Sequence, residues 1–260
     1  MSLLRVNDLG LRFGELTAFE DVSFEVGEGE LLAVIGPNGA GKTSLFNVLS
    51  RVYRPTAGGM WMGERDLLSL RASQLAGIGV ARTFQNLGLF AHLSVLENVL
   101  IGRHHLMHAG ALRAGLWWGF AAREERRHRA QAMQTLEFVG ISHLAGTPVQ
   151  TLPYGLQKRV ELARALTMEP RLLMLDEPVA GMGADERSEM TELVRRVHGQ
   201  GMTILLVEHD MGMVMEVAQR VLVLDYGRVI ACGSPAEVQR DEQVIRAYLG
   251  QELAEPAGAA

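Results

Sequence analysis

The chain has 260 residues, enough for one large domain or for a domain with an inserted subdomain, at about 100–200 residues per domain. Apolar residues make up 48% of the chain and charged residues 21%, which is typical of a globular protein and excludes a disordered or fibrous one. Acidic residues exceed basic residues by 30 to 25. The net charge of −5 argues against a broad nucleic-acid-binding face, which needs clustered Lys and Arg in excess.

Cysteine usage and hydropathy indicate the compartment. The single cysteine, Cys232, excludes an intrachain disulfide and fits a reducing environment. No apolar run approaches the ~18–20 residues that span a bilayer, since the longest candidate, 109–122, is short and contains Arg113. Residues 1–8 lack the apolar segment of a signal peptide. We therefore expect a cytosolic chain that does not itself cross a membrane.

The predicted strands fall into two kinds. Residues 3–11 and 18–26 alternate between apolar and polar positions around a turn at Gly14, which predicts two antiparallel strands. Later strands are short continuous apolar runs, and such runs are typical of strands buried on both faces. These runs are Leu31–Ile35, Leu172–Leu175, Thr203–Val207 and Val221–Leu224.

Helical patterns alternate with the buried runs, which predicts an α/β domain with a largely parallel core sheet. The strand candidates Met60–Met62 and Val229–Ala231 lie near glycines, and we assign them to the antiparallel sheet, layered on the core. Residues 90–150 are predicted to be an inserted helical subdomain. The predicted helices of the core are 41–50, 157–167, 184–198 and 211–218.

Residues 36–43 match the pattern G-x-x-x-x-G-K-[ST] at every fixed position, between a predicted strand and a predicted helix. The glycines let backbone N–H groups point inward around phosphates, and the helix N-terminus adds positive partial charge. Lys42 is predicted to neutralise the β- and γ-phosphates, and Thr43 to offer its hydroxyl to Mg²⁺. The predicted nucleotide-binding residues here are Gly36, Pro37, Asn38, Gly39, Ala40, Gly41, Lys42, Thr43 and Ser44.

Two acids follow the apolar run that ends at Leu175. At the carboxyl edge of a parallel sheet, such acids lie beside bound phosphates. We predict that Asp176 holds Mg²⁺, usually through a water, and that Glu177 polarises the attacking water as general base. His209 follows another buried run at the same edge, and we predict that it contacts the γ-phosphate. The neutral amide of Gln85 suits both Mg²⁺ and the attacking water.

Taken in order, these motifs resemble the nucleotide-binding subunit of ATP-binding cassette (ABC) transporters over nearly the whole chain. The resemblance identifies a signature segment at Leu152–Gln157 from the run Gln157-Lys158-Arg159-Val160-Glu161 that closes it. It places Phe13 where this family stacks an aromatic ring on adenine. It also places Tyr154 and Gly155 where a cassette contacts the ATP of its partner.

The resemblance implies an α/β fold of the P-loop NTPase (RecA-like) class. It comprises an ABC ATPase core with an antiparallel β subdomain and an inserted α-helical subdomain. We expect a single domain over 1–260. The ATP-binding core with its β subdomain takes 1–90 and 160–235, the helical subdomain takes 91–159, and the C-terminal helix and tail take 236–260.

The signature segment departs from the family pattern Leu-Ser-Gly-Gly-Gln. Pro153 replaces the serine, so the hydroxyl that meets the partner's γ-phosphate is absent, and proline has no N–H. Gly155 and the N-terminus of a helix beginning near Leu156 remain to attract an anion. Gly183 stands where many relatives have an aspartate, which puts communication between the two sites by that route in doubt.

Several segments narrow the resemblance to importers of branched-chain amino acids. They are the signature segment, 179–182, 207–211 and the ending 244–250. Urea and short-amide importers look similar and remain an alternative. A non-transport ABC ATPase is a third interpretation. DNA-handling members separate their halves by long heptad coils, and none appears in this sequence; ribosome-acting members carry two cassettes, and 260 residues hold only one. A GTPase would need a guanine-reading segment such as Asn-Lys-x-Asp, which this sequence lacks.

The resemblance implies that two cassettes, identical or related, sandwich two ATP molecules with Mg²⁺. Hydrolysis would power two membrane permease subunits, with an extracytoplasmic solute-binding protein acting indirectly and no nucleic-acid partner. The chain would lie at the cytoplasmic face of the cell membrane as a peripheral subunit. Leu87, Leu89 and Phe90 follow Gln85 and are predicted to line a groove for a permease helix.

Overall fold

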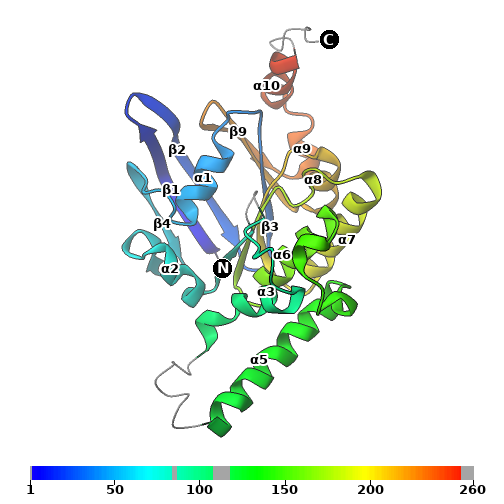
Figure 1. Cartoon of the computed structure of the whole chain (residues 1–260). Helices are drawn as coiled ribbons and strands as arrows, with labels where there is room; N and C mark the ends of the chain where they lie inside the picture. Colours follow the sequence, from blue (N-terminus) through cyan, green and yellow to red (C-terminus); the bar gives the residue numbers. More distant parts are fainter. Residues whose placement is uncertain (1, 84–86, 108–117, 253–260) are drawn as a thin grey trace.

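Two β-sheets and a layer of helices make up residues 2–83, 87–107 and 118–252, which this computed structural model describes (Figure 1). One sheet has four strands in the order β2-β1-β4-β5, and the other has six in the order β10-β9-β3-β8-β7-β6. Helix α1 lies between the sheets, while α3, α6 and α7 cover the opposite side of the larger sheet (Figure 1). The predicted α/β class is confirmed.

The six-stranded sheet is the core of the fold. Its five parallel strands lie in the order β9-β3-β8-β7-β6, and β10 runs antiparallel to β9 at one edge. The four buried runs predicted from the sequence are all strands of this sheet. The strands are β3 (Leu31–Ile35), β6 (Val80–Arg82), β7 (Leu172–Asp176), β8 (Thr203–Val207), β9 (Arg220–Asp225) and β10 (Arg228–Gly233).

The smaller sheet is antiparallel throughout. Its strands are β1 (Ser2–Phe13), β2 (Leu16–Gly27), β4 (Ala57–Met62) and β5 (Arg65–Asp66). The assignment of Val229–Ala231 to this sheet is wrong, because these residues lie in β10 of the core sheet. The two turn residues between β9 and β10, Tyr226 and Gly227, both have positive φ (43° and 76°), which is the hairpin turn that pairs neighbouring strands.

The helices begin and end close to the predicted positions, except at the signature segment. There α6 begins at Tyr154 and not near Leu156, because Pro153 takes the N-cap, where its missing N–H removes no intrahelical hydrogen bond. The longer helices are α1 (Lys42–Leu49), α3 (Val95–Gly102), α5 (Trp118–Phe138), α6 (Tyr154–Leu166), α7 (Ala184–Gly199), α8 (Met211–Val217) and α10 (Glu242–Glu252). Two single turns are α2 (Ala72–Leu75) and α9 (Pro235–Val238), and short 3₁₀ segments cover Leu67–Ser69, Ala76–Ile78, His104–Leu106, Ser142–Leu144 and Val149–Thr151.

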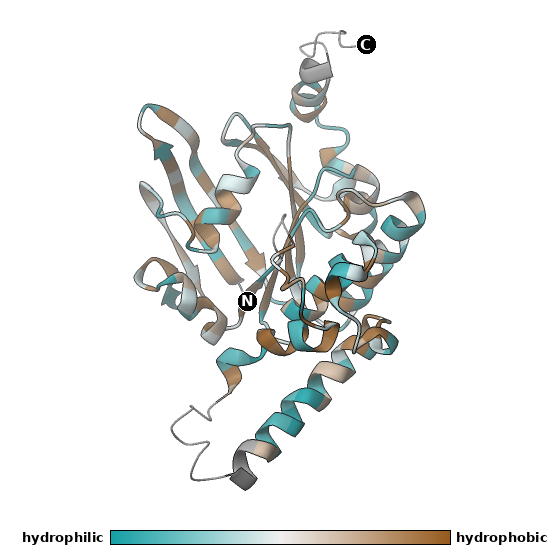
Figure 2. Ribbon diagram, in the orientation of Figure 1, coloured by the Kyte–Doolittle hydropathy of each residue, from teal (hydrophilic) through white to brown (hydrophobic). Residues whose placement is uncertain are grey.

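Two hydrophobic cores lie on the two faces of the core sheet. Successive side chains of a strand point to opposite faces, so Leu31, Ala33 and Ile35 pack against the helices, while Leu32 and Val34 pack against the smaller sheet and α1. The strands of the core sheet are predominantly hydrophobic in Figure 2, and α5 is predominantly hydrophilic. Within the described residues, no helix combines the length and the apolar character that a membrane crossing requires.

Candidate functional site

The loop at 36–41 joins β3 to α1 and is packed too closely for side chains at two positions. A Cβ on Gly36 would lie 2.0 Å from the Leu224 carbonyl oxygen, and one on Gly41 would lie 2.7 Å from the Ala18 carbonyl oxygen. Both glycines also have positive φ, 150° and 100°. Because only glycine combines these conformations with this close approach, the glycines fix the path of the loop.

Lys42 is curled into this loop. Its Nζ donates to the Gly36 and Pro37 carbonyl oxygens at 2.6 and 2.9 Å, which uses two of its three N–H bonds among the described residues. Burial lowers the pKa of Lys42, and the Glu177 carboxylate opposes that change. An ammonium group that is removed from water and still has an N–H without a hydrogen-bond acceptor is suited to binding an anionic ligand.

A cavity of about 450 Å³ opens over the loop and collects most of the predicted nucleotide-binding residues. Phe13 lies at its rim with 46% of its surface exposed, edge-on to the Tyr53 ring at 5.3 Å between centroids. An exposed aromatic face at this place suits the stacking of a base. The lining residues are Phe13, Leu16, Thr17, Ala18, Asn38, Gly39, Ala40, Gly41, Lys42, Thr43, Ser44 and Glu177.

The predicted acids lie at the carboxyl edge of the core sheet. Asp176 is 2% exposed, and its Oδ2 accepts from Arg82 Nη2 at 2.7 Å. Glu177 has a left-handed backbone (φ 47°), and its N–H donates to the Val207 carbonyl oxygen at 2.9 Å. His209 Nδ1 lies 3.8 Å from Glu177 Oε1. The structure therefore brings Glu177 and His209 together, as their positions after neighbouring strands predict.

Arg82 is a residue of this site that sequence reasoning missed. Besides Asp176, its guanidinium donates to Asn47 Oδ1 at 2.9 Å and to the Phe46 carbonyl oxygen at 3.2 Å. It thus connects the helix after the phosphate loop to the strand that carries the acids. A single arginine on a short strand belongs to no sequence pattern that would predict this role.

Tyr248 of α10 ties the C-terminal segment to the start of the phosphate loop. Its hydroxyl is buried beside the Gly36 backbone. Burial raises the pKa of Tyr248 to about 12, the Gly36 backbone opposes this rise, and Asp225 adds to it. The phenol therefore lies beside Gly36 and the end of β9, although it is 212 residues further along the chain.

The predicted signature residues are not among those that line the cavity over the phosphate loop. Tyr154 and Gly155 form the first turn of α6, where a Cβ on Gly155 would meet Glu186 Oε1 at 2.4 Å. Lys158, one turn later, places Nζ 3.4 Å from the Glu177 carbonyl oxygen. The start of α6 is therefore packed against the segment that carries Glu177 and against the start of α7.

Gln85 lies outside the described residues, so its predicted role has no geometry here. Within the described part of the chain, no group of three or more His, Cys, Asp and Glu side chains is arranged to hold a metal ion. A cation at this edge would therefore need oxygen ligands from a bound phosphate and from water, in addition to Asp176 and Thr43. This is the mode in which Mg²⁺ binds to nucleotides.

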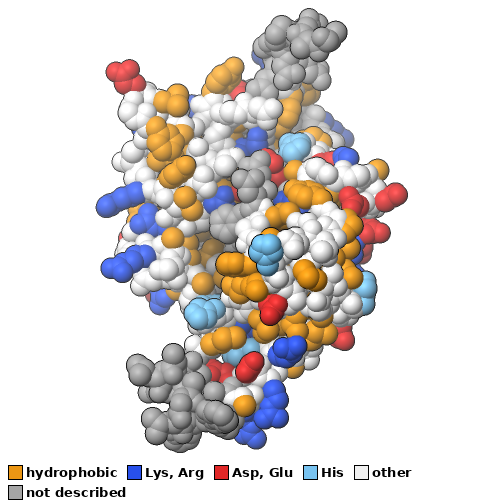
Figure 3. Space-filling model, in the orientation of Figure 1, with side chains coloured by type: hydrophobic (Ala, Val, Ile, Leu, Met, Phe, Trp, Pro, Cys, Tyr) orange, Lys and Arg blue, Asp and Glu red, His pale blue; other side chains and the backbone are white. Residues whose placement is uncertain are grey.

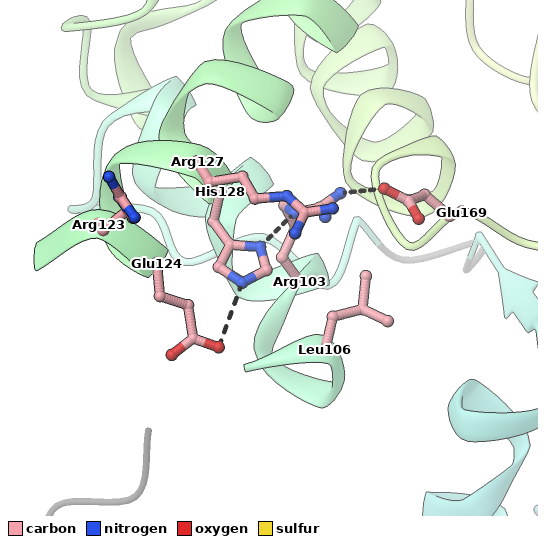
Figure 4. Close-up of a pocket in the computed structure, with 7 residues that line it drawn as sticks. All are labelled: Arg103, Leu106, Arg123, Glu124, Arg127, His128 and Glu169. Atoms are coloured by element: carbon pink, nitrogen blue, oxygen red, sulfur yellow. Dashed lines mark hydrogen bonds and ion pairs between the residues drawn. The ribbon is translucent and has the colours of Figure 1, made fainter. Parts of the chain in front are cut away.

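A second cavity, of about 480 Å³, lies in the helical layer and contains none of the predicted site residues (Figure 4). Its charged groups are largely paired with one another: the buried Arg103 donates to His128 Nδ1 at 2.7 Å and to Glu169 Oε1 at 2.9 Å. Because Arg103, His128 and Glu169 already pair with one another, and the cavity over the phosphate loop collects most of the predicted nucleotide-binding residues, the latter is the better candidate for a ligand site.

Comparisons with known proteins agree with this site. The model of the ABC transporter family matches residues 19–180, and a model described as branched-chain amino acid ATP-binding cassette transporter matches residues 228–254. The chain is 41% identical to the high-affinity branched-chain amino acid transport ATP-binding protein LivG of Salmonella typhimurium, over 96% of this chain and 98% of that protein. It is 38% identical to BraF of Pseudomonas aeruginosa, over the same shares of the two chains.

The structural comparison gives the same family. A nucleotide-free ATP-binding cassette from an ABC transporter superposes with a TM-score of 0.83 at 30% identity, over 95% of this chain and 99% of that one. An ATP-binding cassette in its ADP conformation also gives 0.83 at 30% identity, over 96% and 99%. With the family model covering more than half of its residues, the chain belongs to the ABC transporter family and is one of its ATP-hydrolysing cassettes.

Proposed function

We propose that this chain powers the import of branched-chain amino acids through a membrane ABC transporter, as a peripheral subunit at the cytoplasmic face of the cell membrane. The observation that carries the proposal is the 41% identity to LivG over nearly all of both chains. The sulfate/thiosulfate import protein CysA of Bradyrhizobium diazoefficiens is 34% identical and is matched over 70% of its length. The match of the branched-chain family model to 228–254 supports the same choice.

In this proposal ATP binds in the cavity over the phosphate loop. Phe13 stacks on the adenine, and the backbone N–H groups of 36–44 with Lys42 hold the phosphates. Thr43, Gln85 and Asp176 hold Mg²⁺, which supplies positive charge to the phosphate oxygens when it is bound. The incomplete hydrogen bonding of Lys42 supports the phosphate contact, and the position of Asp176 at the end of β7, directly before Glu177 of the cavity, supports the metal contact.

Hydrolysis is assigned to the carboxyl edge of the core sheet. Glu177 acts as general base on the attacking water, and His209 contacts the γ-phosphate. The 3.8 Å between the two side chains supports a shared task, because both can reach one bound phosphate. Gln85 completes the set as a ligand of both the metal and the water.

We place Tyr154 and Gly155 against the ATP of a second cassette, identical or related. Their position on α6, away from this chain's own phosphate loop, supports a role in a two-cassette sandwich. In that sandwich the helical subdomain, 91–159, moves relative to the core, which takes 1–90 and 160–235. Residues 236–260 form the C-terminal helix and tail. The extracytoplasmic solute-binding protein acts through the permeases only.

The permease subunits are proposed to dock in a groove of about 610 Å³ between α2 with strand β6 on one side and the helical layer on the other. Its lining includes Gly88, three residues after Gln85, with Val52, Leu75 and Ile101. The predicted groove residues Leu87, Leu89 and Phe90 flank Gly88 and do not line this groove themselves, although Phe90 is 54% exposed. On the face drawn in Figure 3, hydrophobic side chains gather beside the helical layer, which supports a protein partner there.

The test is reconstitution of the chain with two permease subunits and a solute-binding protein from the same organism in lipid vesicles. We expect leucine, isoleucine or valine with the binding protein to stimulate ATP hydrolysis. Urea and short amides serve as control solutes. Stimulation by urea in place of leucine would favour the urea importer, and hydrolysis indifferent to every solute would contradict a transport function.

A further inference from the structure

Glu208 is a carboxylate without accessible surface. It follows the last residue of β8, directly before His209, and is 0% exposed. A buried carboxylate is costly unless its oxygen atoms accept hydrogen bonds. The groups that donate to Glu208 therefore show what the fold uses it for.

Among the described residues, Glu208 accepts its hydrogen bonds from backbone N–H groups of two loops. Glu208 Oε1 accepts from the Val179 N–H at 3.0 Å. Its Oε2 accepts from the His209 N–H at 2.8 Å and from the Asp210 N–H at 3.1 Å. The His209 Nδ1 lies 3.7 Å from Glu208 Oε2, and no Lys or Arg forms an ion pair with Glu208 within the part of the chain that the structure describes. The side chain thus bridges the loop after β7 to the loop after β8.

These two loops carry the two side chains assigned to hydrolysis. Val179 is two residues after Glu177, and the Glu177 backbone is in the left-handed region (φ 47°), which is unfavourable for a residue with a Cβ. Such a conformation persists when the surrounding structure holds it. Two contacts stabilise it here: the bridge through Glu208, and the hydrogen bond that the Glu177 N–H donates to the Val207 carbonyl oxygen.

We propose that Glu208 is a positioning residue for ATP hydrolysis, which fixes the distance and orientation between Glu177 and His209 by joining their loops. The proposal rests on the function assigned above to those two residues. Glu208 does not line the nucleotide cavity, and its bonds do not involve the phosphate loop. It therefore acts on the chemical step and not on the binding of ATP.

The bridge needs a carboxylate in particular. Both oxygen atoms of Glu208 accept from N–H groups, and an amide of the same shape has only one oxygen. In a Glu208→Gln variant, the amide NH₂ must face at least one backbone N–H, so one of the two loops loses its anchor. Glu208→Asp keeps the charge but shortens the side chain by one methylene, so it cannot reach both loops.

The experiment compares ATP hydrolysis by the wild-type chain, Glu208→Gln and Glu208→Asp in the reconstituted transporter. For both variants we expect kcat to fall about 10–100-fold, as a small misplacement of reacting groups does. The KM for ATP should stay within about twofold, because the phosphate loop keeps its contacts. The control is Glu64→Gln, an acid-to-amide change at an exposed position in the turn between β4 and β5, for which wild-type kcat is expected.

Hydrogen exchange gives a second measurement that does not depend on turnover. In Glu208→Gln the amides of Val179, His209 and Asp210 should exchange faster, while those of Phe46 and Val48 on α1 keep their protection. If Glu208→Gln does not fold, Glu208→Asp carries the comparison. Unchanged kcat in a folded variant, or a raised KM with unchanged kcat, would overturn the proposal. Absence of hydrolysis in the wild-type transporter would instead contradict the function proposed above.

Discussion

The ammonium group of Lys42 is held by two carbonyl oxygens of its own loop, at 2.6 and 2.9 Å. Burial lowers the pKa of this lysine, and the nearby Glu177 carboxylate counteracts the change. A bound phosphate would complete the set of partners with charge-assisted hydrogen bonds, which are about twice as strong as neutral ones. The loop thus holds a desolvated charge in place before the nucleotide arrives.

Replacement of Lys42 by alanine should therefore weaken ATP binding. Hydrogen bonds to charged groups contribute about 1.5–3 kcal/mol each, so we expect a loss of roughly 10–100-fold in affinity. Isothermal titration calorimetry with ATP and Mg²⁺ measures it, with the exposed Arg171→Ala as a control for loss of one positive charge. Equal dissociation constants for Lys42→Ala and the wild type would contradict the phosphate contact.

Residues within one continuous motif could be predicted from the sequence, and residues linked across the fold could not. Lys42 and the acids at the end of β7 stand at fixed spacings between a strand and a loop, so their place follows from the local pattern. The Arg82–Asp176 pair joins positions 94 residues apart, and Glu208 meets Val179 across 29 residues. Such contacts depend on which strands lie side by side, and no local pattern encodes that order.

Among the elements, α3 and α5 are joined by a buried charged network. Arg103 at the end of α3 donates to His128 of α5, whose Nε2 lies 3.9 Å from Glu124 (Figure 4). Burial, followed by the Arg103 charge, lowers the pKa of His128 from 6.5, while Glu124 and Glu169 oppose the change and Arg127 adds to it. The folded chain therefore favours the neutral imidazole.

This network predicts a loss of stability in acid. A histidine whose pKa is lowered by folding stabilises the folded state fully at a pH above its pKa in the unfolded chain, about 6.5. That stabilisation is lost as the pH falls through the pKa of the folded state. Thermal unfolding of the wild type and His128→Asn should be compared at about pH 7.5 and about pH 5.5. We expect the midpoint to drop less in the variant. An equal drop in both proteins would show that other groups carry the acid sensitivity.

The elements themselves were predictable where one pattern dominates. The strands β3 and β8 have the predicted ends, because each is a continuous apolar run bounded by residues that favour turns. The sheet of β10 was not predictable from its own residues, since the turn at Tyr226 and Gly227 decides its partner. Helix α6 begins at Tyr154, two residues before the predicted start near Leu156. Pro153 occupies the N-cap, where a proline does not interrupt a helix, so the helix begins directly after it.

At the scale of the whole molecule, ATP is expected to hold two cassettes together, and hydrolysis to release them. Glu177→Gln keeps the shape of the side chain but removes the base, so kcat should fall about 10²–10⁴-fold while ATP stays bound. The variant should then accumulate as a dimer with ATP and remain a monomer with ADP, as light scattering during size-exclusion chromatography would show.

The double variant Lys42→Ala with Glu177→Gln is the control, because it lacks both the base and the phosphate contact. It should stay monomeric at ATP concentrations that dimerise the single variant. A dimer that forms equally with ATP, with ADP and without nucleotide would show that the nucleotide is not part of the interface. Near-normal turnover in Glu177→Gln would exclude this residue as the base.

The two hydrophobic cores share a single set of strands, with Leu32 and Val34 in one core and Leu31, Ala33 and Ile35 in the other. Neither core can lose this sheet while the other keeps it, so the β layer and the helical layer are bound to unfold as one cooperative unit. The phosphate loop continues directly from β3, at the centre of that sheet. A destabilising substitution in either core therefore reaches the nucleotide site through the same strand, and bound ATP in turn stabilises both layers at once.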